Sequence, residues 1–348
     1  MSPTTNDLVL PRPGATLGAP QPPIPGPTET AFTTTFGALL PPAKFLTTPT
    51  GKAAYYEIPP SSTTSSAPPS PSPSATTTPD RVLLIHGVQT PALGMLPLAR
   101  ALHASFPSAH LALVDLWGHG LSDTPVIPHD AALFHGLIDA VLDALAWPAA
   151  HLIGFSFGGA LTVGYVGSRP ERVKSYALVA PAGLIRSSGF PVDEQRYLRR
   201  GGGEEGEEEV DEAAARDWVL RVLEGGELRV PGDWEERVRR GEVVAEAVRG
   251  WQMREHPGHT ASVVAVFRDG GVMDREAEFV RAVETGIPAV VVLGGLDDLC
   301  TEEELKELGF KDVHVVPQVG HGVVRERVPE VAGFIGDFWK HLDGVKSS

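Results

Sequence analysis

The sequence predicts an α/β fold in which a mostly parallel sheet carries helices on both faces. Short, unbroken apolar runs alternate with helix-length segments between residues 81 and 179. This pattern is typical of strands that are buried on both faces and joined by right-handed crossovers. Two further apolar runs, 289–293 and 313–316, resume the pattern near the C-terminal end. A chain of 348 residues with 42% hydrophobic side chains is long enough for one large domain with an inserted subdomain.

The elements follow one another in a regular order. A hairpin is expected first, because Lys44–Thr48 and residues 53–58 flank the turn Pro49-Thr50-Gly51. The alternation of apolar strands with helices then predicts strand 81–85, helix 93–106, strand 110–114, helix 131–146, strand 150–154, helix 158–168 and strand 174–179. After the strands at 289–293 and 313–316, a last helix is expected from about Pro329.

The alternation breaks between residues 184 and 275. Two helices are expected there, at 212–223 and 234–254, and their apolar positions favour these side chains for the buried faces: Trp218, Val219, Val222, Leu223, Val243, Val244, Val248 and Trp251. Before them, residues 203–212 include seven carboxylates in ten positions. Charges this dense repel one another and show no metal-ligand spacing, so we expect a solvated, partly disordered loop.

Composition divides the rest of the chain and excludes several functions. Residues 1–30 are rich in Pro and Thr and predict a disordered tail, and 59–80 predict a low-complexity loop within a core made of 31–183 and 276–348. The net charge of −15 argues against nucleic acid and an anionic membrane surface as partners. The single cysteine, Cys300, excludes an internal disulfide and is expected to be a packing thiol. Without a membrane-spanning run or signal peptide, a cytoplasmic location is expected.

A nucleophile is indicated by Gly154-Phe155-Ser156-Phe157-Gly158, which follows one strand and precedes a helix. This G-x-S-x-G order is the nucleophile-elbow pattern, in which a serine is held on a sharp turn with its hydroxyl exposed. A serine hydroxyl needs a base to take its proton and a carboxylate to orient that base. Asp297 and Asp298 follow the strand at 289–293, and His321 follows the strand at 313–316. These side chains should therefore meet Ser156 at the carboxyl edge of the sheet.

Taken together, these motifs resemble the α/β hydrolases of the lipase, esterase and lactonase type. Leu84-Ile85-His86-Gly87-Val88 is similar to the family's strand that ends in His-Gly, and residues 115–123 are similar to its D-x-x-G-x-G-x-S turn. The resemblance implies an eight-stranded α/β-hydrolase sheet with a helical cap over residues 184–275.

The same resemblance assigns roles to the site residues. Ser156, Asp297 and His321 fall where the family keeps its triad, with Asp298 as the alternative acid. The backbone N–H groups of Val88 and Phe157 would form the oxyanion hole. His86 would have a structural, hydrogen-bonding role, His119 is expected to be a rim or packing residue, and no cofactor or metal is implied.

The expected activity is hydrolysis of a small-molecule carboxylic ester or lactone through an acyl-serine. Two alternatives use the same triad, namely hydrolysis of a carbon–carbon bond and acyl transfer. A third is a non-catalytic ligand-binding protein with the same fold, although such proteins often lose a triad member and this chain has candidates for all three.

Overall fold

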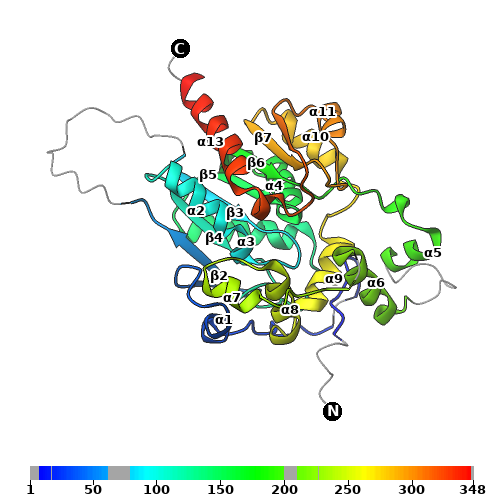
Figure 1. Ribbon diagram of the computed structural model, residues 1–348. Coiled ribbons are helices and arrows are strands. Elements are labelled where there is room, and N and C mark those ends of the chain that lie inside the picture. Colours follow the sequence, from blue (N-terminus) through cyan, green and yellow to red (C-terminus); the bar gives the residue numbers. More distant parts are fainter. Residues whose placement is uncertain (1–7, 17, 62–78, 200–209, 226, 346–348) are drawn as a thin grey trace.

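A computed structural model describes residues 8–16, 18–61, 79–199, 210–225 and 227–345. These residues contain an eight-stranded sheet in the order β1-β2-β4-β3-β5-β6-β7-β8 (Figure 1). Strand β2 is antiparallel to both of its neighbours, and all other neighbouring strands are parallel. The expected mostly parallel sheet is therefore confirmed. Its strands are β1 Lys44–Thr48, β2 Gly51–Ile58, β3 Arg81–Ile85, β4 His110–Val114, β5 Ala150–Phe155, β6 Val173–Val179, β7 Ala289–Gly294 and β8 Val313–Val316.

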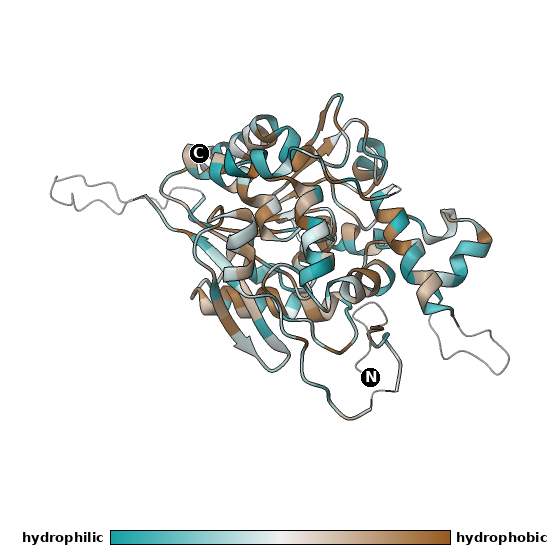
Figure 2. Cartoon of the chain, turned by 60° about the horizontal axis from the view of Figure 1, so that its bottom comes forward, coloured by the Kyte–Doolittle hydropathy of each residue, from teal (hydrophilic) through white to brown (hydrophobic). Residues whose placement is uncertain are grey.

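Helices cover both faces of this sheet. Successive side chains of a strand point to opposite faces, so a strand that is apolar throughout must be buried on both faces. In β3, Leu83 and Ile85 belong to one hydrophobic core, which also contains side chains of α3 (Ala131–Ala144), α4 (Phe157–Ser168) and α10 (Glu276–Glu284). Val82 and Leu84 belong to a second core, with α2 (Leu96–Ser105) and α13 (Val328–Val345). Several helices show hydrophobic and hydrophilic sides in Figure 2, as this two-sided burial requires.

Local sequence sets the ends of several of these helices. Asp130 caps α3 by accepting a hydrogen bond from the Leu133 N–H at 3.0 Å. Thr301 and Glu304 form a reciprocal capping box at the start of α11. The remaining elements of the core are α1 Glu29–Phe36, α11 Glu302–Glu307, α12 Val323–Glu326 and the 3₁₀ helices η1 Ala92–Met95 and η2 Pro170–Arg172.

The interval between β6 and β7 is helical, but its helices differ from those expected. The predicted helix 234–254 is wrong as a single element: it is two helices separated by residues 240–244, where Gly241 has a left-handed φ of 87° that an α-helix cannot contain. A further helix, α9, was not expected. The acidic stretch 203–209 lies outside the described residues, as do residues 62–78 of the expected low-complexity loop. Besides α10, the helices here are η3 Ser187–Gly189, α5 Val192–Gln195, η4 Arg196–Leu198, α6 Glu212–Glu224, α7 Trp234–Arg239, α8 Ala245–Glu255 and α9 His259–Asp269.

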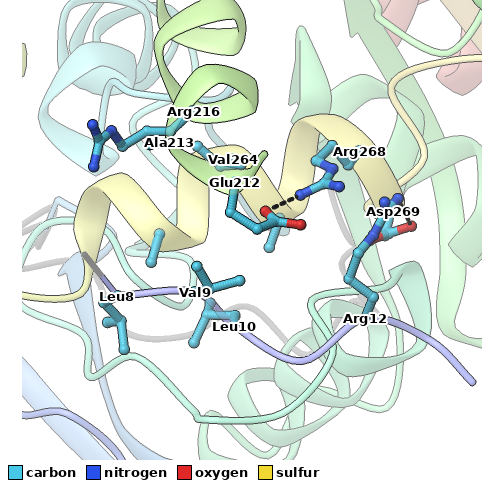
Figure 3. Close-up of a pocket in the computed structure, with 12 residues that line it drawn as sticks. Leu8, Val9, Leu10, Arg12, Glu212, Ala213, Arg216, Val264, Arg268 and Asp269 are labelled. Carbon is cyan, nitrogen blue, oxygen red and sulfur yellow. Dashed lines mark hydrogen bonds and ion pairs between the residues drawn. The ribbon is translucent and has the colours of Figure 1, made fainter. Parts of the chain in front are cut away.

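The prediction of a disordered tail over residues 1–30 does not hold for 8–16 and 18–30, which are placed against the domain. Leu10 is buried, and Arg12 forms an ion pair with Asp269 of α9 at 2.8 Å (Figure 3). Residues 8–10 also border a cavity of about 180 Å³ against α6 and α9. Ile24 bridges to Thr124, and helix α1 follows from Glu29. The few apolar residues and the single arginine of this segment thus find partners far along the chain, which composition does not reveal.

Helix α1 extends this packing to the inserted helices. Phe32 and Phe36 are buried, and their rings lie 5.3 Å and 5.9 Å from that of Trp251 in α8. The N-terminal segment therefore contacts α8 as well as α9 of the insertion. None of the helices in the described ranges is long and apolar enough to cross a membrane.

Candidate active site

Ser156 lies on the turn between β5 and α4, in a conformation that side chains rarely adopt. Its φ is 54° and its ψ is −119°. The flanking glycines are required by close backbone contacts: a Cβ at Gly154 would lie 2.3 Å from the carbonyl oxygen of Gly158, and a Cβ at Gly158 would lie 2.2 Å from that of Ile85. The G-x-S-x-G pattern thus brings β5, α4 and the end of β3 close together, with the serine at the point where they meet.

Ser156, His321 and Asp297 lie in hydrogen-bonding contact. The Nε2 atom of His321 is 2.9 Å from Ser156 Oγ, and its Nδ1 atom is 2.9 Å from Asp297 Oδ2. The side chain of Asp297 is 3% exposed, and its Oδ1 accepts a hydrogen bond from the Leu299 N–H at 3.3 Å. Asp298 is exposed. Of the two carboxylates that fit the sequence pattern, it is therefore Asp297 that contacts the histidine.

The backbone of residues 86–88 passes directly beside the serine. A Cβ at Gly87 would lie 2.8 Å from Ser156 Cβ and 3.2 Å from its Oγ. Val88 follows this glycine, and Phe157 is the first residue of α4, where a helix leaves its N–H groups without intrahelical partners. Within the described part of the chain, neither the Val88 N–H nor the Phe157 N–H donates a hydrogen bond. Both amides remain available to a ligand oxygen.

His86 holds this loop to the segment that follows β4. Its Nε2 accepts a hydrogen bond from the Leu116 N–H at 2.9 Å, so the proton resides on Nδ1, which donates to the Gly87 carbonyl oxygen at 2.6 Å. Burial of the ring lowers the pKa of His86 to about 4. A neutral ring is required for this pair of bonds, and the geometry fits the structural role expected for His86.

Gln89, the residue after Val88, is held in a left-handed conformation by the inserted helices. Its φ is 67°. Its carbonyl oxygen accepts a hydrogen bond from Gln252 Nε2 of α8 at 2.6 Å, and its own Nε2 donates to Glu224 Oε1 of α6 at 2.8 Å. Its N–H donates to Nε2 of His119, which is fully buried and so is a packing residue rather than a rim residue. The position of the Val88 amide thus depends on α6 and α8.

Gln252 and Glu224 were not predicted as residues of the site. Gln252 is fully buried, and besides its bond to Gln89 it accepts a hydrogen bond from the Gly120 N–H at 2.7 Å. The sequence did contain one sign of this role, because Gln252 is a polar residue beside the apolar positions Val248 and Trp251 that were expected to be buried. That signal identifies a buried polar group, but it does not identify the partner.

The D-x-x-G-x-G-x-S turn is built around a buried carboxylate. Asp115 accepts hydrogen bonds from Tyr56 Oη at 2.7 Å and from the N–H groups of Ala92 and Leu121 at 2.9 Å and 3.0 Å. Burial raises the pKa of Asp115 to about 6. A Cβ at Gly120 would lie 2.2 Å from this carboxylate. The motif therefore shapes a turn and does not place Asp115 in contact with Ser156.

Helices α8 and α9 dock on the carbonyl groups of the same turn. His256 Nε2 lies 2.8 Å from the Ser122 carbonyl oxygen, and His259 Nδ1 lies 2.8 Å from that of Gly118. Both rings are buried, and burial lowers the pKa of His256 to about 4 and that of His259 to about 3. The insertion is thus attached to the core by neutral histidines.

Other chemistry-bearing residues do not join the site. The buried thiol of Cys300 contacts the Pro181 carbonyl oxygen at 3.6 Å, and burial raises its pKa to about 12. In the described ranges no three His, Cys, Asp or Glu side chains converge as metal ligands. The cavity next to residues 8–10 is a separate place, because its lining does not include Ser156, Asp297 or His321.

Comparisons with known proteins agree with this architecture. Residues 82–334 match the model of a family described as the alpha/beta hydrolase family. A Pseudomonas putida protein, the dihydrolipoyllysine-residue acetyltransferase component of the acetoin cleaving system, is 29% identical over 63% of this chain and 53% of its own length. The chain thus spans about half the length of that relative.

Solved structures resemble the chain in fold. The enol-lactonase from Burkholderia xenovorans LB400 superposes with a TM-score of 0.58 at 19% identity. The match covers 85% of this chain and 100% of the enol-lactonase chain. The haloalkane dehalogenase DbeA from Bradyrhizobium elkani USDA94 gives a TM-score of 0.57 at 20% identity, covering 87% and 99% of the two chains. At such identities the likeness shows the fold alone.

Proposed function

The chain belongs to the alpha/beta hydrolase family, and from this premise we propose that it is a serine hydrolase that cleaves a carboxylic ester or lactone through an acyl-enzyme intermediate. The observation that carries the proposal is the contact of His321 with both Ser156 Oγ and Asp297 Oδ2, each at 2.9 Å. A histidine placed between a hydroxyl and a buried carboxylate can accept the hydroxyl proton, since the carboxylate orients the ring and stabilises its charged form.

In the proposed reaction, Ser156 Oγ attacks the acyl carbonyl carbon while His321 Nε2 takes the hydroxyl proton. The amides of Val88 and Phe157 stabilise the oxyanion that forms. Because these N–H groups are already oriented by Gln89 and by the start of α4, little reorganisation is needed when the charge develops.

Collapse of the tetrahedral intermediate expels the leaving alcohol, which receives the proton from His321. A water molecule then attacks the acyl-serine, with His321 as the base, and releases the carboxylic acid and the free serine. In a lactone, the leaving alcohol stays joined to the acyl group and departs with it. We propose that the insertion at residues 184–275 acts as a cap over this site and limits the entry of water.

The first test is labelling with a fluorophosphonate, which reacts with activated serines. We expect one adduct per chain, located at Ser156 by mass spectrometry and lost in Ser156→Ala. Cys300→Ser is the control for adventitious labelling of the buried thiol and should label like the wild type. A correctly folded protein that remains unlabelled would contradict the mechanism and favour a ligand-binding role. Labelling would justify assays with esters and lactones of graded acyl length.

Acyl transfer is a second candidate, because the chain is similar to part of a protein named as an acetyltransferase component. Transfer and hydrolysis share the acyl-serine and differ in whether water or another nucleophile reaches it. Partitioning of one ester between acid and a new ester, measured with increasing concentrations of an acceptor alcohol or thiol, separates the two.

A further inference from the structure

Arg325 is a partly buried charged side chain among the parts of the candidate active site, with its Nη1 atom fully buried. It lies on α12, four residues after His321. Its guanidinium carbon is 5.4 Å from the centre of the Phe155 ring, and that ring lies 5.1 Å from the imidazole of His321. A Cβ at Gly94 of η1 would lie 3.7 Å from its Nη1 atom. The guanidinium thus contacts the residue before Ser156 and the segment that follows the Val88 loop.

No acidic side chain of the described residues forms an ion pair or a hydrogen bond with this charge, although Glu246 and Glu326 lie near enough to stabilise it at a distance. The Arg325 guanidinium takes part in no salt bridge of the described residues and donates no hydrogen bond to them, and its Nη1 atom is buried without a partner. The neighbouring arginine of α8, Arg249, takes the nearby carboxylates instead, with Glu224 at 3.2 Å and Glu246 at 3.6 Å. Burial and the proximity of Arg249 lower the pKa of Arg325 to about 10, so its charge persists at neutral pH.

An enclosed and unpaired charge destabilises the fold, and replacement by an apolar side chain usually removes that cost. An arginine at such a position therefore needs a ligand that supplies the missing negative charge. Nη1 faces Gly94, which leaves the edge formed by Nε and Nη2. Two parallel N–H groups on that edge have the spacing that a carboxylate accepts bidentately.

We propose that Arg325 binds a carboxylate on the substrate, so that the preferred substrate is an ester or lactone that carries a second, ionised carboxyl group. This inference rests on the proposed serine-hydrolase function and narrows its substrate class. The negative charge of the whole chain, −15, repels anionic substrates, and a local cation next to the nucleophile offsets that repulsion.

The test compares two esters of similar length, monomethyl adipate and methyl hexanoate, of which only the first is charged. We expect the wild type to have the higher kcat/KM for monomethyl adipate. Arg325→Met should lower that kcat/KM by about 10- to 100-fold, the factor for losing a charge-assisted pair of hydrogen bonds, mainly through KM. Its kcat/KM for methyl hexanoate should stay within about twofold of the wild type, because the neutral ester makes no ion pair.

Arg327→Met is the matched control, because it removes the same charge only two residues further along the chain. The Arg327 side chain already has a partner, Glu330, at 3.4 Å. It should keep the wild-type preference. Equal losses on both esters in Arg325→Met, or a wild type without preference for the charged ester, would overturn the inference. If neither ester is hydrolysed and the fluorophosphonate fails to react, the proposed function itself fails.

A binding measurement keeps the inference testable apart from turnover. In a Ser156→Ala background, adipate should raise the Tm, because a ligand that binds only the folded state stabilises it. The same concentration should not raise the Tm of Ser156→Ala/Arg325→Met. The Arg325→Met change alone should leave the Tm equal or higher, since it removes an unpaired charge. An equal rise with adipate in both backgrounds would place the carboxylate elsewhere and contradict the inference.

Discussion

Acidification from pH 6 to pH 5 should destabilise this protein through a group of buried histidines that joins the core to the insertion. The group comprises His86 and His119 of the core with His259 and His256 of the insertion. In that order, successive ring centres lie 5.2 Å, 4.9 Å and 6.1 Å apart. All four are buried, and each donates a hydrogen bond to a backbone carbonyl as a neutral ring. Protonation would place several positive charges in one desolvated cluster.

The size and sign of the effect follow from the pKa values. Burial lowers the pKa of His86 and His256 to about 4 and that of His259 to about 3. In the unfolded chain a histidine titrates near pH 6.5, so between pH 6.5 and 4 the unfolded state binds protons that the folded state does not. Stability is therefore fully present above pH 6.5 and is lost as the pH falls. At about 1.4 kcal/mol per pH unit and proton, these three groups contribute a loss of about 3–4 kcal/mol from pH 6 to pH 5.

The assay is urea unfolding at a series of pH values, with the free energy of unfolding plotted against pH. His256→Gln supplies the sharpest variant, because the glutamine amide can donate to the Ser122 carbonyl as Nε2 does but cannot titrate. Its slope between pH 6 and 5 should be smaller by about one proton, or about 1.4 kcal/mol per pH unit. His341→Gln, at an exposed position of α13, controls for the loss of a histidine. An unchanged slope in His256→Gln would refute the reasoning.

Four substitutions test the geometry around the nucleophile. Gly87→Ala should abolish fluorophosphonate labelling while the circular dichroism spectrum stays native, because the added carbon would lie 2.8 Å from Ser156 Cβ. Asp297→Asn should lower kcat by about 10⁴-fold, whereas Asp298→Asn should leave it within about twofold. Ester kinetics on the two variants check this, and the reverse order of losses would mean that Asp298 is the acid. Gln252→Leu should lower kcat by about 10²-fold with little change in KM, because it releases the loop that carries the Val88 amide. An unchanged kcat would mean that this loop holds its shape without the contact to Gln252.

Local sequence was sufficient for the features that arise from contiguous residues. The strands β3 to β8 follow from short apolar runs. The elbow follows from Gly154 and Gly158, where an added Cβ would lie 2.3 Å and 2.2 Å from a backbone carbonyl oxygen. The proximity of Ser156, Asp297 and His321 could be anticipated because each follows a strand of one parallel sheet. Choosing between Asp297 and Asp298 required the actual path of the loop.

Contacts between remote segments could not be read from the sequence. Arg12 and Asp269 are 257 residues apart, and Gln89 and Gln252 are 163 apart. Nothing in the local pattern of either partner names the other, so the placement of the N-terminal segment and the support of the Val88 loop by α8 were missed. The break at Gly241 was missed because a helical apolar period continues on both sides of it.

Three non-glycine residues with left-handed backbone affect how a more thermostable variant could be engineered. Gln89, Ser156 and Ala180 have φ values of 67°, 54° and 44°. The first two belong to the site itself, while Ala180 directly follows β6, the strand beside the elbow. A designer who screens for thermostability would find glycine attractive at Gln89, since glycine adopts this conformation without steric cost. That choice would also remove the amide that reaches Glu224 and would free the peptide next to Val88. Selection for heat resistance at this position would then favour proteins that survive heating but turn over slowly.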